Sequence, residues 1–287
     1  MRDRITRTLV VAALSAVTAA SAGAQSKAQQ LASIDSLVSE AMKIAALGTQ
    51  EMTQQTLRAQ PGNSLGSESA WGAGWGDFFA GVGYQSRARF SSRPDGSASA
   101  GFGLGNSHDL GLEIGITSAS TFNETPGKNG SFSAKVHRVF FDDYGFAVGV
   151  ENLVNWGNTD GGSSTYGVVS HTVALGDDPT HFGGSLSWNV GVGNSRFLSQ
   201  SDLAAGKSGV NVFGSAGLRV AARGSVVADW TGQDLDLGLS LVPLHKSPLV
   251  LSISAVDLTR RAGNGPRLVI GLGAGFRVYD LVHGQNQ

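Results

Sequence analysis

Apolar residues alternate with small or polar ones over most of the chain that follows residue 71. One run has leucine at every second position from Leu235 to Leu241, and the longest run extends from Leu268 to Val278. A period of two places successive side chains on opposite faces of a β-strand. About twelve such runs fit between residues 71 and 280. The sequence therefore predicts an all-β, antiparallel fold of about twelve strands, with ten or fourteen as alternatives.

The residues between the apolar ones indicate which kind of β protein this is. They are mostly Gly, Ser and Asn, in a chain with 41 Gly and only 15% charged residues. A soluble β-sandwich needs charged and polar side chains on its outer face, whereas a transmembrane barrel turns its apolar row to lipid and its polar row to the lumen. The runs span about 8 to 14 residues, which brackets the ~9 to 11 that cross a bilayer when tilted. The pattern favours a transmembrane β-barrel, and a soluble exported β-sandwich is the less favoured alternative.

The first 24 residues have the features of an export signal. Three arginines precede an apolar run at residues 9–20, and Ala22, Gly23 and Ala24 form a small-residue cleavage site. This run is shorter than the ~20 residues of a spanning helix. We therefore expect residues 1–24 to be a cleaved signal peptide and the mature protein to reach the bacterial outer membrane. Cleavage removes three arginines and one aspartate, so the net charge changes from −1 to −3, and no basic patch indicates nucleic acid as a partner.

Residues 25–60 differ from the rest in composition and periodicity. They contain one glycine, Gly48, and apolar residues spaced three and four apart. This spacing predicts a short amphipathic helix at about residues 29–47. Three roles stay open for it: a plug in the lumen, a periplasmic coiled coil, or a tether. Residues 61–70 are predicted as a linker, residues 71–280 as the barrel and residues 281–287 as a polar tail.

The predicted connections between strands alternate in length. Those after odd-numbered strands lie at residues 86–95, 120–129, 157–162, 194–206, 232–233 and 257–265. Those after even-numbered strands lie at residues 105–107, 141–143, 175–182, 221–223 and 243–247. Most of the first group are longer, as expected when outer loops are long and periplasmic turns are short. The first group is therefore predicted to face outward, with 232–233 and 175–182 as exceptions in length.

The export signal, the alternating strands and the loop asymmetry come together with two motif-like stretches. These are WGAGWGD at residues 71–77 and DWTGQD at residues 229–234. With these features, residues 71–280 resemble a bacterial outer-membrane β-barrel of the porin-like kind. The resemblance implies outer-membrane lipid and the barrel insertion machinery as partners. A homo-oligomer is an open alternative, and no cofactor is implied.

Strand parity assigns a set of polar residues to the lumen. They comprise five acids, four bases, one histidine and one asparagine: Glu113, Lys135, His137, Glu151, Asn155, Arg219, Asp229, Asp234, Asp236, Arg267 and Arg277. Charges at bilayer depth must pair or contact water. We expect either salt bridges that hold the barrel or a pore lining with weak ion selectivity, because the signs nearly balance. Glycines in the same row leave room for water or for the N-terminal helix.

No residue pattern indicates catalysis, a cofactor site or a metal site. The chain has no Cys, which excludes cysteine zinc sites, and its Asp-Gly pairs lack the spacing of a calcium loop. Of six histidines only His137 and His171 lie mid-strand, and the parity of the strand around His171 is ambiguous, because Tyr166 competes with Val169 for the outer face. We expect no enzyme. Most Trp and Tyr side chains are predicted to form an aromatic girdle, in a set comprising Trp71, Trp75, Trp156, Trp188, Trp230, Tyr84, Tyr144, Tyr166 and Tyr279.

Two functions follow from the sequence. The first is a passive, weakly selective channel for small solutes, or a structural membrane protein. The alternative is a closed barrel that serves in surface interaction or adhesion through its outer loops, above all those at residues 120–129 and 194–206.

Overall fold

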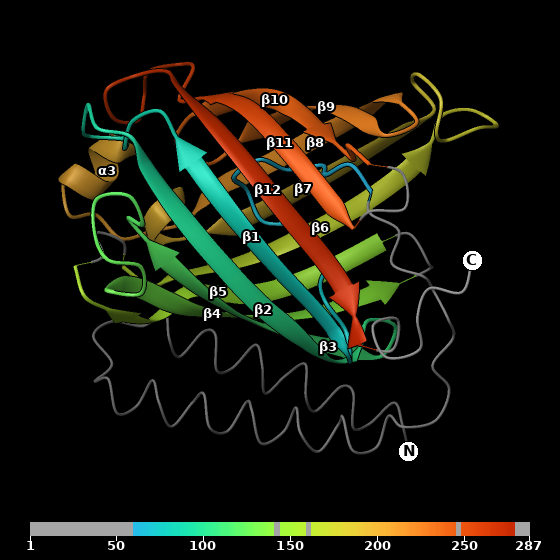
Figure 1. Ribbon diagram of the computed structural model, residues 1–287, viewed down its shortest axis with the longest axis horizontal. Coiled ribbons are helices and arrows are strands. Elements are labelled where there is room, and N and C mark those ends of the chain that lie inside the picture. The colour runs from blue at the N-terminus through green and yellow to red at the C-terminus, as the bar shows by residue number, and fades with distance from the viewer. Residues whose placement is uncertain (1–59, 141–143, 159–161, 245–247, 279–287) are drawn as a thin grey trace.

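A computed structural model shows the chain as a closed barrel of twelve antiparallel strands (Figure 1). The structure describes residues 60–140, 144–158, 162–244 and 248–278. The strands are β1 Asp77–Gln85, β2 Asp95–Asn106, β3 Leu110–Ala119, β4 Asn129–Phe140, β5 Tyr144–Trp156, β6 Ser164–Ala174, β7 Ser185–Gly193, β8 Asn211–Ala221, β9 Gly224–Trp230, β10 Leu235–Leu241, β11 Leu249–Val256 and β12 Arg267–Arg277. The predicted antiparallel barrel of about twelve strands is confirmed. The predicted signal peptide, the helix at about 29–47 and the tail at 281–287 lie outside the described residues.

The barrel closes by pairing of its first and last strands. The register of β1 on β12 runs from Asp77 opposite Arg277 to Gln85 opposite Val269. Each other strand pairs with its neighbours in the sequence. Because the number of strands is even, β1 begins and β12 ends at the same rim. Within the described residues no helix is long and apolar enough to span a membrane.

The two faces of the wall have opposite chemistry. On β7, Val190 is 53% exposed while the neighbouring Asn189 is fully buried, and Asn189 pairs in register with the buried Ser215 of β8. The same contrast recurs around the barrel, where the exposed outer residues include Val82, Ile116, Val192, Val212, Leu237, Leu239, Ile253 and Leu272. Apolar residues outside and polar residues inside are the arrangement of an outer-membrane type of β-barrel.

Aromatic side chains gather on the outer face near both rims. Phe78 stacks on Phe276 with ring centroids 6.1 Å apart and also contacts Phe102, at the rim where β1 begins. At the opposite rim Phe132 lies 5.4 Å from Trp156, again centroid to centroid. Aromatic rings at these two levels are typical of the interfaces of a membrane barrel.

Two of the residues assigned to the girdle point inward instead. Tyr166 is only 4% exposed on the inner row of β6. Trp71 precedes β1, and its ring lies 3.2 Å from the position that a Cβ at Gly145 would occupy on the inner row of β5. The prediction is wrong for these two, because position near a strand end does not show which face a ring occupies. On β6 the exposed Val169 shows that the odd-numbered residues face outward. His171 therefore faces outward too, and its ring stacks on the ring of Tyr144 with centroids 3.9 Å apart.

The connections form two different rims. We call one the loop rim, with connections at residues 86–94, 120–128, 157–163, 194–210, 231–234 and 257–266, and the other the turn rim, with 107–109, 141–143, 175–184, 222–223 and 242–248. The connection at 194–210 contains the 3-10 helix η1 Ser195–Phe197 and the short helix α3 Gln200–Ala204, which lies at the loop rim in Figure 1. Most connections of the loop rim are longer than most of the turn rim, as predicted; 231–234 and 175–184 are the expected exceptions, and 242–248 is as long as 157–163.

Candidate functional site

The lumen contains a stretch of the chain itself. Residues 60–76, which we call the inner segment, precede β1 and contact strands on opposite sides of the barrel. The backbone N–H of Gly62 donates to Ser240 Oγ on β10 at 2.7 Å. The N–H of Ala70 donates to Ser170 Oγ on β6, also at 2.7 Å. The region predicted as a linker therefore lies inside the barrel and narrows it.

The inner segment is held first by one carboxylate of β9. Asp229 is fully buried, and its Oδ2 accepts four hydrogen bonds from consecutive residues of the segment. The donors are Ser64 Oγ at 3.0 Å and the N–H groups of Leu65, Gly66 and Ser67 at 2.7, 2.9 and 3.0 Å. Successive backbone N–H groups that converge on one anion form a cradle for negative charge. We call this contact the apex anchor.

A second set of contacts holds the return of the inner segment towards β1. Glu113 Oε2 accepts from the Ala73 N–H at 2.8 Å, and Lys135 Nζ donates to the Trp71 carbonyl at 2.8 Å. Lys135 and Glu113 form an ion pair at 3.1 Å. His137 Nε2 lies 3.0 Å from the Ala73 carbonyl oxygen. We call this group on β3 and β4 the return anchor.

Glycines make the close approach at the return anchor possible. A Cβ at Gly103 would lie 2.2 Å from the carbonyl carbon of Ala73, which is backbone and cannot move aside. The ring of His137 lies between Gly72 and Gly111, where a Cβ would come within 2.5 and 2.3 Å of it. The room that the glycine row was expected to leave is therefore filled at this level by the inner segment and by His137.

Large inner aromatic rings fill the lumen beside β6–β8. Phe197 of η1 is fully buried and stacks on Phe213 with centroids 4.3 Å apart, and Tyr166 contacts both. Glycines again provide the space, because a Cβ at Gly191 or Gly193 would lie 2.3 Å from one of these rings. The start of the connection at 194–210 is thus packed into the barrel through Phe197, whereas its later part, with Leu203 and Val210, is exposed.

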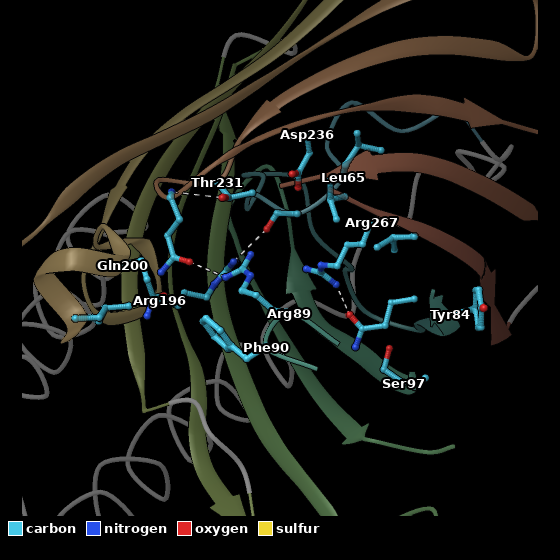
Figure 2. Close-up of a pocket in the computed structure, with 18 of the residues that line it drawn as sticks. Leu65, Tyr84, Arg89, Phe90, Ser97, Arg196, Gln200, Thr231, Asp236 and Arg267 are labelled. Carbon is cyan, nitrogen blue, oxygen red and sulfur yellow. Dashed lines mark hydrogen bonds between the residues drawn. The ribbon is translucent and has the colours of Figure 1, made fainter. Parts of the chain in front are cut away.

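A cavity opens between the inner segment and the loop rim (Figure 2). Its volume is about 480 Å³, and the apex of the inner segment at Leu65 and Gly66 forms part of its lining. The polar side chains that line it are Tyr84, Gln85, Arg89, Ser97, Ser195, Arg196, Gln200, Thr231, Gln233, Asp236 and Arg267. We call it the mouth cavity.

Two of its arginines share one buried carboxylate. Arg89 donates to Asp257 Oδ1 at 3.1 Å and Arg267 donates to Asp257 Oδ2 at 2.7 Å, while Asp257 is 1% exposed. The same two arginines also donate to amide oxygens, Arg89 to Gln233 Oε1 at 2.6 Å and Arg267 to Gln85 Oε1. Figure 2 shows the guanidinium groups of Arg89 and Arg267 beside each other in the cavity. The wall here is a connected network of charged and amide groups.

A third arginine reaches the cavity from η1. Arg196 forms ion pairs with Glu151 of β5 and, at 3.3 Å, with Glu68 of the inner segment. It also donates to the Gly66 carbonyl at 3.1 Å. Arg196 therefore ties the loop rim, the wall and the inner segment together.

The turn between β9 and β10 holds a neighbouring loop. Asp234 is fully buried, and its Oδ1 accepts from the Thr259 hydroxyl and N–H at 2.6 and 2.7 Å and from the Leu235 N–H at 2.8 Å. Its Oδ2 accepts from the N–H groups of Arg261 and Ala262 at 2.7 and 3.0 Å. Burial raises the pKa of Asp234. Hydrogen bonds from Thr259, Leu235 and Ala262 lower that pKa by more than burial raises it, so the net pKa lies below its ordinary value.

The structure places the predicted lumen residues in several separate groups. Glu113, Lys135, His137 and Asp229 bind the inner segment, as does Arg219 through Gln60 at 2.9 Å. Asp236 and Arg267 line the mouth cavity, and Glu151 binds Arg196. Arg277 pairs with Asp77 at 2.7 Å, Asp234 holds the loop at 257–266, and Asn155 lies opposite the buried Ser131.

Sequence reasoning missed several residues of the site. Arg89, Arg196, Gln233 and Asp257 lie in connections, and Glu68 lies in the inner segment. Strand parity says nothing about such positions. The DWTGQD stretch at residues 229–234, for which the sequence indicates no role, contains two fully buried carboxylates, Asp229 and Asp234.

Comparison with known proteins gives only remote likeness. No protein-family model matches the chain, and no curated protein matches it. Among solved structures, it is similar to an outer membrane channel from Pseudomonas putida F1, at 13% identity and a TM-score of 0.38, over 76% of this chain and 100% of that one. It is also similar to the N-terminal β-barrel domain of OprF from Pseudomonas aeruginosa, at 9% identity and a TM-score of 0.19, over 70% of this chain and 96% of that one. Neither likeness is strong enough to assign a family or an activity to this chain.

Proposed function

We propose that this protein is a passive channel of the bacterial outer membrane for small polar solutes. The apolar outer wall contacts lipid, the long connections of the loop rim face outward, and the inner segment narrows the path. The observation that carries the proposal is the mouth cavity, which opens at the loop rim, ends against the inner segment and has three arginines and three glutamines in its lining.

The charges of the lumen support weak ion selectivity. Lys135 is paired with Glu113, and Arg277 with Asp77. Paired charges of opposite sign leave little net field to favour one sign of inorganic ion. We therefore expect a reversal potential near zero in a potassium chloride gradient.

The channel is tested by conductance of the full mature chain in planar bilayers. Heat-modifiable migration in unboiled gels first establishes that the barrel is folded, and fractionation establishes that it stays with the membrane. We expect a small steady current in the wild type and a larger one in a variant that lacks residues 60–70. No current in either protein contradicts the channel, and a strongly cation- or anion-selective current contradicts the weak selectivity.

A closed barrel that serves in surface interaction is the second candidate. The observation that favours it is that the inner segment is bonded to strands on both sides of the lumen, from Ser240 of β10 to Lys135 of β4. This candidate predicts no steady current in the wild type and a current only after residues 60–70 are removed. The same recordings therefore separate the two functions.

A further inference from the structure

Several hydrogen-bond acceptors at the mouth cavity are already occupied by arginines of its wall. The amide oxygens of Gln85 and Gln233 already accept from Arg267 and Arg89. The carboxylate of Asp257, which both arginines share, is 1% exposed and lies behind them. These three acceptors are therefore engaged within the wall, while the guanidinium groups of Arg89, Arg196 and Arg267 bring N–H donors to the lining of the cavity.

Among the charged residues that line the cavity, bases outnumber acids. Three arginines line the cavity, and the side chains of Arg89 and Arg196 are both 31% exposed. Asp236 is the one acid among the described lining residues, and it is 5% exposed and accepts from the Asp257 N–H at 2.8 Å. A solute in the cavity thus meets guanidinium groups first and their carboxylate partners behind them. Such a surface favours a group that is negative and rich in acceptors.

The arginines are also positioned before any solute arrives. Asp257 fixes Arg89 and Arg267 against each other, and Glu68 and Glu151 fix Arg196. A guanidinium that is already held loses little side-chain entropy when it binds a ligand. The planar fork of arginine matches carboxylate and phosphate oxygens better than it matches isolated hydroxyl groups.

We propose that the mouth cavity is a binding site for small oxyanions, that is, solutes that carry a carboxylate or phosphate group. The volume of about 480 Å³ suits a small metabolite and not a polymer. The proposal rests on the proposed channel function only in treating the bound anion as a solute that enters the barrel. Weak selectivity between potassium and chloride is compatible with it, because the paired charges deeper in the lumen govern inorganic ion flow.

The test is calorimetric titration of the folded, full mature chain in detergent at constant ionic strength. The probes are succinate, inorganic phosphate and glucose, in separate titrations. We expect succinate or phosphate to bind and glucose to give no signal, and the tighter of the two anions identifies carboxylate or phosphate as the recognised group. Binding by neither anion, or binding of glucose as tight as theirs, overturns the proposal.

Three variants locate the site. Arg89→Gln and Arg267→Gln each remove one guanidinium and should weaken oxyanion binding about tenfold or more. Arg93→Gln is the matched control, because Arg93 is exposed on the same connection as Arg89 and does not line the cavity. The control should keep its affinity within about twofold, since a remote exposed charge contributes little. An equal loss in all three variants overturns the assignment to this cavity.

Binding and conduction are separable in this design. A barrel that binds succinate but passes no current refutes the channel and retains the site. A barrel that conducts but binds neither anion refutes the site and retains the channel. Heat-modifiable migration of each variant confirms folding before titration, and the three probes on the wild type decide the proposal even where a variant does not fold.

Discussion

Two segments of this barrel are held by carboxylates only five positions apart on one hairpin. Asp229 holds the apex of the inner segment, and Asp234 holds the loop at 257–266. Both side chains are fully buried. They differ in how completely they are used: Asp234 accepts through both oxygens, whereas Asp229 accepts its four bonds through Oδ2, and its Oδ1 has no partner among the described residues.

This difference suggests that the loop at 257–266 is held more firmly than the apex of the inner segment. The loop at 257–266 is held by Asp234 and, through Asp257, by Arg89 and Arg267 as well. The apex of the inner segment relies on one oxygen of Asp229 and on Arg196. A buried acceptor without a partner is a cost that the folded state carries. We infer that the loop is a permanent part of the mouth and that the inner segment is the part whose removal opens the barrel.

The largest loss of stability is expected from Asp234→Ala. Five donors lose the fully buried carboxylate that joins the turn to the loop, and the free energy of unfolding should fall by about 3–5 kcal/mol. Urea unfolding of the barrel in lipid vesicles measures it. Asp202→Ala is the control, because Asp202 pairs with Lys207 in the exposed part of the connection at 194–210, and its loss should change the free energy of unfolding little. Equal losses in the two variants would show that Asp234 does not hold the loop.

Asp229→Ala should cost less stability and change conductance more. Three backbone N–H groups and one hydroxyl lose their acceptor, but the released apex can reach water in the mouth cavity, so we expect a loss of about 2–4 kcal/mol. Single-channel recording should show a larger or more frequently open current than in the wild type, while Asp234→Ala leaves the current size unchanged. A current that grows in Asp234→Ala and not in Asp229→Ala would reverse the roles of the two segments.

Breaking the return anchor should cost less stability than removing either Asp234 or Asp229. The effects of substituting Lys135 and Glu113 should also depend on each other. Lys135→Met leaves Glu113 without its ion-pair partner, and we expect a loss of about 2 kcal/mol, because both side chains keep partial access to solvent. Adding Glu113→Gln removes the uncompensated charge, so the double variant should be more stable than Lys135→Met alone. The coupling is read from urea unfolding of the two single variants and the double variant. Strictly additive losses would show that the ion pair is not formed in the folded barrel.

The close approach of the inner segment to β2 gives a smaller and more local effect. Gly103→Ala forces a Cβ against the Ala73 carbonyl, and we expect a loss of about 1–3 kcal/mol and faster proteolysis of residues 60–76. Gly273→Ala on the inner row of β12 is the matched control, since its nearest contact would be 3.8 Å away. The control should be as resistant to protease as the wild type. Equal resistance in both variants would mean that the inner segment does not pass over Gly103.

The sequence predicts the wall of this barrel much better than its contents. Alternation exposes the outer row of β10 directly, because every leucine from Leu235 to Leu241 must share one face. The same parity gives Glu113 and Lys135 as inward residues. It fails for the inner segment, which has no regular period, and for Arg89 or Asp257, whose partners lie far away in sequence. Asp229 and Asp236 are register partners with the same parity, and only the tertiary structure shows that Asp229 binds the inner segment while Asp236 lines the mouth cavity.

The smallest effect is expected from acid acting on the loop that Asp234 holds. The pKa of the Asp234 carboxyl in the folded barrel lies below its ordinary value of 3.8. The stability that this carboxylate contributes is therefore complete above about pH 4 and is lost as the pH falls from there towards the pKa of the folded state. Hydrogen exchange in the peptide that covers 257–266, corrected for intrinsic rates, should therefore be constant from about pH 8 to pH 5 and rise below about pH 4. Asp234→Asn removes the titrating group and should abolish this step. A step centred above pH 5 would instead assign the acid response to another group and leave the loop at 257–266 without its proposed anchor.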